Sequence, residues 1–137
     1  MNLPIPHPPA LVWFRRDLRD HDHAALAAAL HNSRAVYCAF VFDRDILDQL
    51  PGHHDRRLQF IHASLHELDA ALRARGGGLI VRMGKASAEI PELAKRLGVQ
   101  VVFTHRDYEP AAKARDQRVA VALAKSGIDF VSLKDRA

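Results

Sequence analysis

Residues Leu11 to Leu26 read LVWFRRDLRDHDHAAL, and this stretch decides the fold. The apolar run Ala10–Phe14 is short and stands between a proline and an arginine, which predicts a strand buried on both faces. A polar loop follows, and Asp22 is suited to cap a helix over the alanine-rich residues His23 to Leu30. A buried strand, a loop and a helix in this order form the repeating unit of a parallel α/β sheet.

The same alternation continues to the end of the sequence. Leucines and isoleucine from Leu58 to Leu72 recur at spacings of three and four, as on one face of a helix. Strands are predicted over Ala35 to Phe42, Leu79 to Met83, Gln100 to Thr104 and Ile128 to Leu133, and helices over Asp55 to Arg75, from a Ser87 cap to Leu97, and from Pro110 to Gly127. We therefore predict a Rossmann-like α/β domain, a five-stranded parallel sheet with helices on both faces.

Length and composition agree with one domain. The chain has 137 residues, of which 48% are hydrophobic, so it can bury a core without disulfides or metal. Residues 1–9 contain four prolines and are expected to form a loose tail, which leaves 10–137 as the folded domain. The single cysteine, Cys38, falls in a predicted strand, and a reducing cytoplasm is the simplest compartment.

The charge balance does not by itself predict a nucleic-acid surface or a membrane protein. Twenty lysines and arginines against sixteen acidic residues give a formal charge of +4, which favours anionic partners only weakly. No apolar run approaches the roughly 18 residues that would span a bilayer. Arg15, Arg16 and Arg19 alternate with aspartates, and local ion pairing, for example with Asp17, is the simplest interpretation.

The polar loops follow the strands. RRDLRDHD comes after the first strand, DRDILDQLPGHHDRR after the second, GKAS after the third and HRDYEP after the fourth. Because ligands of open parallel sheets bind beyond the carboxyl ends of the strands, these loops predict a pocket for a flat ligand with a polar rim.

Common catalytic and nucleotide signatures are missing. Gly76 to Gly78 follow a helix, the reverse of a dinucleotide fingerprint, and Gly84-Lys85 lacks the spacing and hydroxyl of a phosphate loop. His62 and His66 could share a helix face at a spacing that suits zinc, but no third ligand is implied, and exposed or capping histidines are the alternative. Carboxylates after the second and fourth strands could form a hydrolytic pair or simply turns.

One motif has a specific resemblance. Trp13-Phe14-Arg15-Arg16-Asp17-Leu18-Arg19, followed by His21-Asp22 and an Ala/Leu helix, resembles the opening signature of the DNA photolyase/cryptochrome family. The segments Val41-Phe42-Asp43 with Ile46-Leu47, and Asp107-Tyr108-Glu109-Pro110 with Ala114-Arg115-Asp116, are also similar to that family. The order and spacing fit from Ala10 to Asp135, most like a bacterial deoxyribodipyrimidine photolyase.

This resemblance implies an enzyme in two domains, a light-driven lyase that splits pyrimidine dimers. FAD, the electron-carrying tryptophans and the surface for UV-damaged DNA would lie in a C-terminal helical domain that these 137 residues do not include. The fragment alone is therefore expected to be inactive, and Trp13 is expected to be strand core. Apolar surface where the helical domain would dock is expected to favour oligomers of the isolated fragment.

The resemblance also implies an antenna chromophore at the carboxyl edge of the sheet. In members similar to the deazaflavin binders, the matching positions that line the pocket are Arg15, Phe42, Asp43, Arg56, Asp107 and Glu109. Folate-binding members carry an Asn-Glu pair where this sequence has Ala111-Ala112. An 8-hydroxy-deazaflavin or FMN is therefore favoured over a folate.

Three functions stay open at this point. The first is the antenna domain of a light-driven DNA repair enzyme. The second is a cryptochrome-type blue-light sensor, and the third is a free-standing nucleotide-binding module related by fold alone. For single residues there are structural alternatives as well: Arg15 and Arg16 could pair with Asp17 and with neighbouring loops, and Asp107 could cap the last helix.

Overall fold

The computed structural model describes residues 8–43 and 54–135, apart from the side chains of 54, 55 and 57. Most of the predicted proline-rich tail, and residues 44–53 of the predicted loop after the second strand, lie outside these described residues. Among the helices that are described, none combines the length and the apolar character that a membrane crossing requires.

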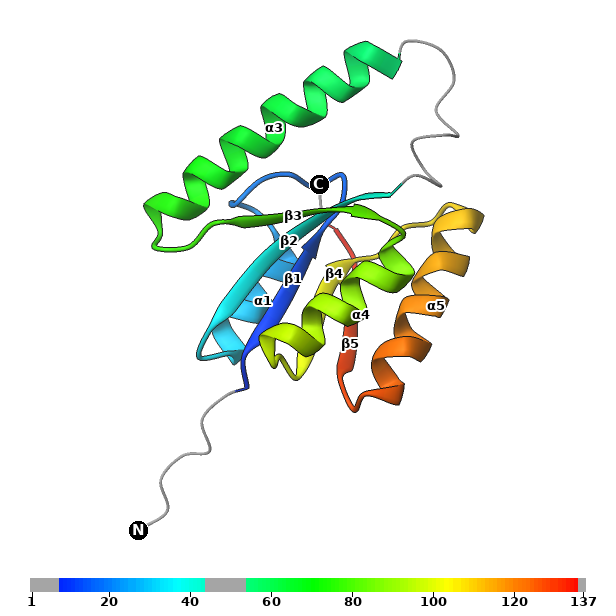
Figure 1. The fold of residues 1–137 in the computed structure, drawn as a ribbon. Coiled ribbons are helices and arrows are strands. Elements are labelled where there is room, and N and C mark those ends of the chain that lie inside the picture. Colours follow the sequence, from blue (N-terminus) through cyan, green and yellow to red (C-terminus); the bar gives the residue numbers. More distant parts are fainter. Residues whose placement is uncertain (1–7, 44–53, 136–137) are drawn as a thin grey trace.

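Five parallel strands form the sheet. They are β1 (Ala10–Phe14), β2 (Val36–Asp43), β3 (Leu79–Gly84), β4 (Val101–His105) and β5 (Asp129–Leu133), in the spatial order β3-β2-β1-β4-β5 (Figure 1). Every neighbouring pair is parallel, with Trp13 of β1 in register with Ala39 of β2 and Thr104 of β4. The predicted parallel α/β sheet is therefore confirmed. The observed strand ends either coincide with the predicted ones or differ from them by one residue.

Helices cover both faces of the sheet. They are α1 (Ala24–Asn32), α3 (His54–Ala74), α4 (Ala86–Leu97) and α5 (Pro110–Lys125). One apolar core joins Leu11 and Trp13 of β1 to α4 and α5, while Val12 and Phe14 pack toward α1 and α3. Because successive side chains of a strand point to opposite faces, a strand between two helical layers must be apolar throughout. All five residues of β1 are accordingly buried.

The strand order reverses beside β1. The chain runs from β1 outward to β2 and β3, and then returns to place β4 on the other side of β1. The loops that follow β1 and β4 lead to helices on opposite faces of the sheet, and ligands of open parallel sheets bind beyond the strand ends at such a point. The RRDLR loop and the HRDYEP segment both start there.

The helix caps differ from the sequence prediction. His23, not Asp22, is the N-cap of α1, because its Nδ1 accepts a hydrogen bond from the Leu26 backbone N–H at 2.9 Å. Asp22 instead adopts a left-handed backbone with φ of 48°. Helix α4 begins at Ala86 without a cap from Ser87, and the Asp43 carboxylate at the end of β2 accepts from the Ala86 N–H at 3.0 Å.

Two prolines behave differently in the outer helices. Pro110 opens α5, as predicted, where its missing N–H has no helical partner to lose. Pro91 lies inside α4, beyond its first turn, and is buried. It lines the groove between α4 and α5.

Candidate functional site

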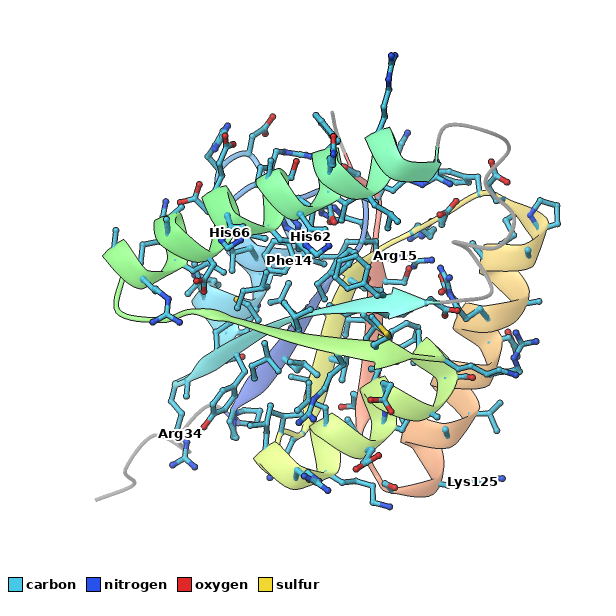
Figure 2. The ribbon with its side chains drawn as sticks, turned by 45° about the horizontal axis from the view of Figure 1, so that its top comes forward. Phe14, Arg15, Arg34, His62, His66 and Lys125 are labelled. Carbon is cyan, nitrogen blue, oxygen red and sulfur yellow. The ribbon has the colours of Figure 1, made fainter. Side chains whose placement is uncertain are left out.

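Arg15 is the first residue after β1 and reaches across the carboxyl edge of the sheet (Figure 2). Its Nη1 donates to Asp116 Oδ2 at 2.7 Å and to the carbonyl oxygen of His105 at 3.1 Å. Its Nη2 lies 3.9 Å from Asp107 Oδ2. The side chain is only 8% exposed, so these contacts compensate for the desolvation of a buried charge.

Two guanidinium groups flank one aromatic ring. Arg15 stands over the Trp13 ring at 4.6 Å from its centroid, and Arg115 of α5 stands at 5.6 Å. Arg115 also lies 3.6 Å from Asp43 Oδ2. Burial lowers the pKa of Arg115, and the charge of Arg15 lowers it further, against the opposing effect of nearby aspartates. We call Trp13, Arg15, Asp43, Asp107, Arg115 and Asp116 the edge cluster.

The edge cluster retains unused hydrogen-bond donors. Among the described residues, Nε and Nη2 of Arg15 and Nε of Arg115 are buried without a hydrogen-bond partner. Buried donors of this kind are rare in folded proteins, and a bound water, ion or ligand would satisfy them. The cluster contains three carboxylates and two guanidinium groups, so it offers acceptors as well as donors.

The structure brings together half of the residues predicted for the pocket. Arg15, Asp43 and Asp107 meet in the edge cluster through the contacts above. Phe42 is buried on the opposite face of the sheet, with its ring 5.0 Å from Phe40 and 5.3 Å from His62. The other two predicted residues are exposed: Arg56 lies on α3, and Glu109 is the N-cap residue of α5.

Arg115 and Asp116 were not among the predicted site residues. Both residues belong to the segment Ala114-Arg115-Asp116, which resembles the family. The helical pattern of α5 did not indicate that this charged pair would point toward the sheet. Arg115 is 6% exposed, which is uncommon for an arginine. Asp107 does not cap α5 as an N-cap residue; its Oδ1 accepts from the Glu109 N–H at 3.0 Å.

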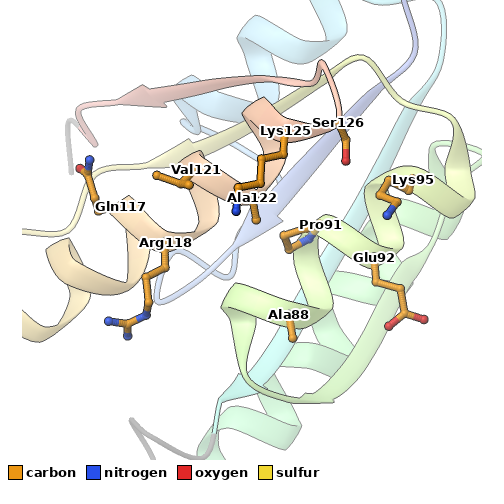
Figure 3. Close-up of a pocket in the computed structure, with 10 residues that line it drawn as sticks. All are labelled: Ala88, Pro91, Glu92, Lys95, Gln117, Arg118, Val121, Ala122, Lys125 and Ser126. Atoms are coloured by element: carbon orange, nitrogen blue, oxygen red, sulfur yellow. The ribbon is translucent and has the colours of Figure 1, made fainter.

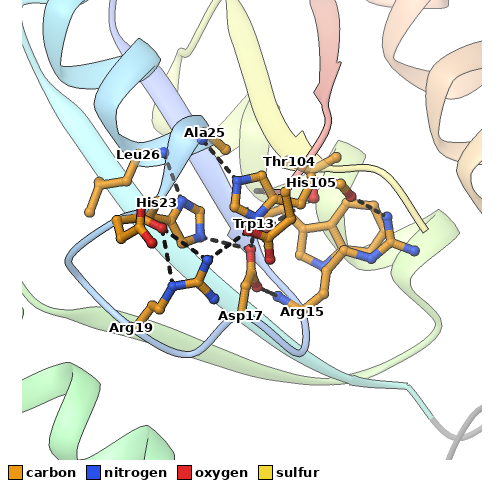
Figure 4. A network of polar contacts seen from close by, with 11 residues as sticks. Trp13, Arg15, Asp17, Arg19, His23, Ala25, Leu26, Thr104 and His105 are labelled. Atoms are coloured by element: carbon orange, nitrogen blue, oxygen red, sulfur yellow. Dashed lines mark hydrogen bonds and ion pairs between the residues drawn. The ribbon is translucent and has the colours of Figure 1, made fainter. Parts of the chain in front are cut away.

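A second polar group lies beside the edge cluster and is fully buried (Figure 4). His23 Nε2 and His105 Nδ1 lie 2.7 Å and 2.6 Å from the same oxygen, Asp17 Oδ2. Both contacts are bent away from ideal hydrogen-bond alignment. The imidazole rings stack with centroids 4.1 Å apart, and none of the three side chains is more than 4% exposed. We call Asp17, His23 and His105 the histidine cluster.

Backbone donors fix the tautomers of both histidines. The Leu26 N–H donates to His23 Nδ1 at 2.9 Å, and the Ala25 N–H donates to His105 Nε2 at 3.1 Å. A nitrogen that accepts a hydrogen bond carries no proton, so each neutral ring presents its N–H to Asp17.

Asp17 is held as a carboxylate. Burial alone would raise its pKa, but the side-chain contacts with His105 and His23 and the backbone N–H of Arg15 together hold the pKa well below its usual range. The Arg15 N–H reaches Asp17 Oδ1 at 2.7 Å. The expected pairing of Asp17 with the Arg15 or Arg16 side chain is therefore wrong, because Asp17 turns inward to the histidines.

The histidine cluster could supply three metal ligands by residue type, and its geometry decides against that role. Ligand atoms around a tetrahedral zinc ion stand about 3.3 Å apart, given bonds of about 2.0 Å. The observed separations of 2.6 and 2.7 Å are shorter. Metal binding would also require moving a proton onto nitrogens that already accept backbone hydrogen bonds. His62 and His66, the pair considered from sequence, are both exposed on α3.

A hollow of about 530 Å³ lies elsewhere, between α4 and α5 (Figure 3). Pro91 and Ala122 line it, together with Lys95, Arg118 and Lys125. None of the edge-cluster side chains lines this groove. The chemistry at the carboxyl ends of the strands is therefore separate from it.

The sequence matches the family described as DNA photolyase over residues 10–137. It is 40% identical over 118 residues to a deoxyribodipyrimidine photo-lyase of Streptomyces griseus, covering 86% of this chain and 26% of the relative. It is 34% identical over 124 residues to a blue-light photoreceptor of Arabidopsis thaliana, covering 88% and 28%. The chain thus spans about a quarter of the length of these relatives.

Solved structures give the same family. A cryptochrome of Synechocystis superposes with a TM-score of 0.85 at 27% identity, over 96% of this chain and 28% of that one. A photolyase of Sulfolobus tokodaii, which holds two FAD molecules and implies a novel light-harvesting cofactor, gives 0.84 at 29% identity, over 92% and 29%. With the family match across the whole described fold, this chain belongs to the DNA photolyase family, as its N-terminal α/β domain.

Proposed function

We propose that this chain is the antenna-chromophore domain of a light-driven DNA repair enzyme, a deoxyribodipyrimidine photolyase. The observation that carries the proposal is the edge cluster. Two buried guanidinium groups with unused donors, both close to the Trp13 ring, lie at the carboxyl edge of the sheet beside the reversal of strand order. Ligands of parallel α/β sheets bind at such a point.

The charge balance of the edge cluster favours one chemical class of ligand. A ligand held by its phosphates calls for an excess of positive charge, whereas here three aspartates accompany two arginines. A flat heteroaromatic ring with donors and acceptors around its rim matches this mixture. We therefore propose that the ring of a flavin-type chromophore, an 8-hydroxy-deazaflavin or FMN, lies at the edge cluster, in preference to the phosphates of an adenine nucleotide. A folate is disfavoured by Ala111-Ala112, where the folate-binding members carry an Asn-Glu pair. Phe42, Arg56 and Glu109 remain proposed members of the pocket.

Titration of the chain with separate ligands tests this proposal. We expect 8-hydroxy-deazaflavin or FMN to bind with a change in fluorescence, and methenyl-folate and AMP not to bind. Arg15→Met should weaken chromophore binding on the order of tenfold or more, the equivalent of one hydrogen bond to a charged group. Arg118→Met, an exposed arginine of α5, is the matched control. Tight binding of AMP with no chromophore uptake would contradict the proposal.

A blue-light sensor is the second candidate, because relatives and structural neighbours include a photoreceptor and a cryptochrome. Repair and sensing differ in the whole protein: FAD and contacts to UV-damaged DNA would come from a helical C-terminal domain. We propose that this domain is the partner of the present chain and that the whole protein works in the cytoplasm. Light-dependent reversal of thymine dimers by the full gene product separates the two functions. The family match excludes the third candidate, a nucleotide-binding module related by fold alone.

A further inference from the structure

We propose that His23 and His105 are positioning residues that hold Arg15 in place through Asp17, and that they do so only while both imidazoles are neutral. The inference deepens the proposed function, because Arg15 lies at the centre of the edge cluster. It rests on that function only where a ligand is concerned. The positioning itself can be measured on the chain without any ligand.

The histidine cluster holds Arg15 at both ends. Asp17 Oδ1 accepts from the Arg15 backbone N–H at 2.7 Å, which fixes the backbone where the chain leaves β1. The His105 carbonyl oxygen accepts from Arg15 Nη1 at 3.1 Å, which fixes the guanidinium group. Asp17 in turn is held by both imidazoles through its other oxygen. A change in the position of either ring therefore alters the contacts of Arg15 through Asp17.

The contacts require neutral rings. Each imidazole uses one nitrogen to accept a backbone N–H at the start of α1 and the other to approach Asp17. A protonated ring has an N–H on both nitrogens, and it would turn one of them against the N–H of Ala25 or Leu26. Protonation therefore breaks the N-cap of α1, or turns the ring away from Asp17.

The surrounding charges can balance one protonated imidazole better than two. Asp17 supplies a single negative charge beside the two stacked rings. The apolar ring of Phe14 packs on His23 with centroids 4.7 Å apart and supplies no charge. Asp135, after β5, lies 3.5 Å from His105 Nδ1, but its other oxygen pairs with Arg19 at 2.6 Å. Arg15, which donates to the His105 carbonyl oxygen, is positive. A doubly protonated pair is thus left with uncompensated positive charge, and the cluster must open.

NMR on the 137-residue chain tests the positioning directly. Ring ¹⁵N shifts should report a proton on Nε2 of His23 and on Nδ1 of His105 near pH 8. The measurement is repeated from about pH 8 down to about pH 5, and these signals should be lost wherever a ring gains its second proton. The exchange protection factors of the Arg15 and Leu26 amides should fall over the same range, by about tenfold or more, as for one hydrogen bond to a charged group.

A pair of asparagines separates positioning from simple structure. In the double variant His23→Asn with His105→Asn, an amide oxygen can cap α1 and an amide N–H can reach Asp17, but neither side chain titrates in this range. Protection of the Arg15 amide should then stay constant down to about pH 5. His66→Asn, at an exposed position of α3, is the control and should keep the wild-type profile.

The ligand arm uses FMN as the probe. In the wild type its affinity should fall in parallel with Arg15 protection, and in the double variant it should not. If FMN fails to bind at any pH, the proposed function fails, while the amide and ring measurements still decide the positioning. Equal Arg15 protection at both ends of the pH range, or the same profile in the double variant as in the wild type, would overturn the inference.

Discussion

The two polar clusters at the carboxyl edge lie side by side and yet differ in how their buried groups are satisfied. In the histidine cluster, backbone donors settle the tautomers, and the two ring nitrogens that make no aligned hydrogen bond each lie within 2.7 Å of the same Asp17 oxygen. In the edge cluster, guanidinium donors remain without a partner and the pKa of Arg115 is lowered by burial. The first arrangement suits a fixed support, and the second suits a site that is completed by a ligand. Substitutions in the two clusters should therefore affect different properties.

The largest effect is expected from Asp17→Ala. It leaves two buried ring N–H groups and the Arg15 N–H without their acceptor. Each unsatisfied buried group costs about 1–3 kcal/mol, so the free energy of unfolding should fall by about 3 kcal/mol or more. Urea denaturation measures this change, with Glu92→Gln on the surface of α4 as the control, where loss of an exposed pair costs under about 1 kcal/mol. A loss for Asp17→Ala no larger than the control would refute the supporting role.

The second largest effect concerns how the free energy of unfolding depends on pH in the acidic range. The pKa of Asp17 in the folded chain lies below its ordinary value of 3.8. The unfolded chain therefore binds a proton on Asp17 before the folded chain does as the pH falls. The stabilisation from this carboxylate is complete above about pH 4 and is lost on further acidification, at up to about 1.4 kcal/mol per pH unit.

Urea midpoints measured against pH test that slope. Asp17→Asn should flatten the profile below about pH 4, whatever its effect at neutral pH. Asp69→Asn is the comparison, because Asp69 pairs with Arg73 at 2.8 Å on the surface of α3. If the two variants lower the slope equally, the buried position of Asp17 has no special weight.

The strands and the location of the site could be predicted from the sequence, because both depend on local pattern and general topology. An apolar run such as Ala10–Phe14 has few alternatives to a doubly covered strand, and parallel strands bring their following loops to one edge. The topology predicted the loops that contain the site, and the family resemblance named the individual residues Arg15, Asp43 and Asp107.

The partners of the polar residues could not be predicted. Asp43, at the end of β2, accepts from the first N–H of α4. His23 and His105 meet only because β1 and β4 are neighbours in the sheet. The same holds for Arg115, which points inward from a helix whose pattern indicates a solvated charge. Side-chain partners of this kind depend on register and helix rotation, which local propensities do not specify.

Arg115→Lys should separate stability from ligand binding. Lysine keeps a positive charge beside the buried Asp43 carboxylate, so stability should change by no more than about 1 kcal/mol, whereas the planar guanidinium group with its unused Nε is lost. Asp43 keeps its hydrogen bond from the Ala86 N–H. The affinity for FMN should nevertheless fall on the order of tenfold. A large loss of stability with unchanged FMN binding would assign Arg115 to the support instead of the site.

The smallest effect concerns the loop that joins the two clusters. Asp22 has a φ of 48°, a left-handed conformation that an aspartate tolerates and a glycine adopts freely. Its carbonyl oxygen accepts from Arg19 Nη2 at 2.9 Å, a contact that does not depend on the side chain of residue 22. Asp22→Gly should therefore raise the free energy of unfolding by no more than about 1 kcal/mol, because relief of strain is partly offset by the greater freedom of glycine in the unfolded chain. A clear loss of stability in urea would mean that the Asp22 carboxylate, and not the backbone conformation, keeps the RRDLR loop in place.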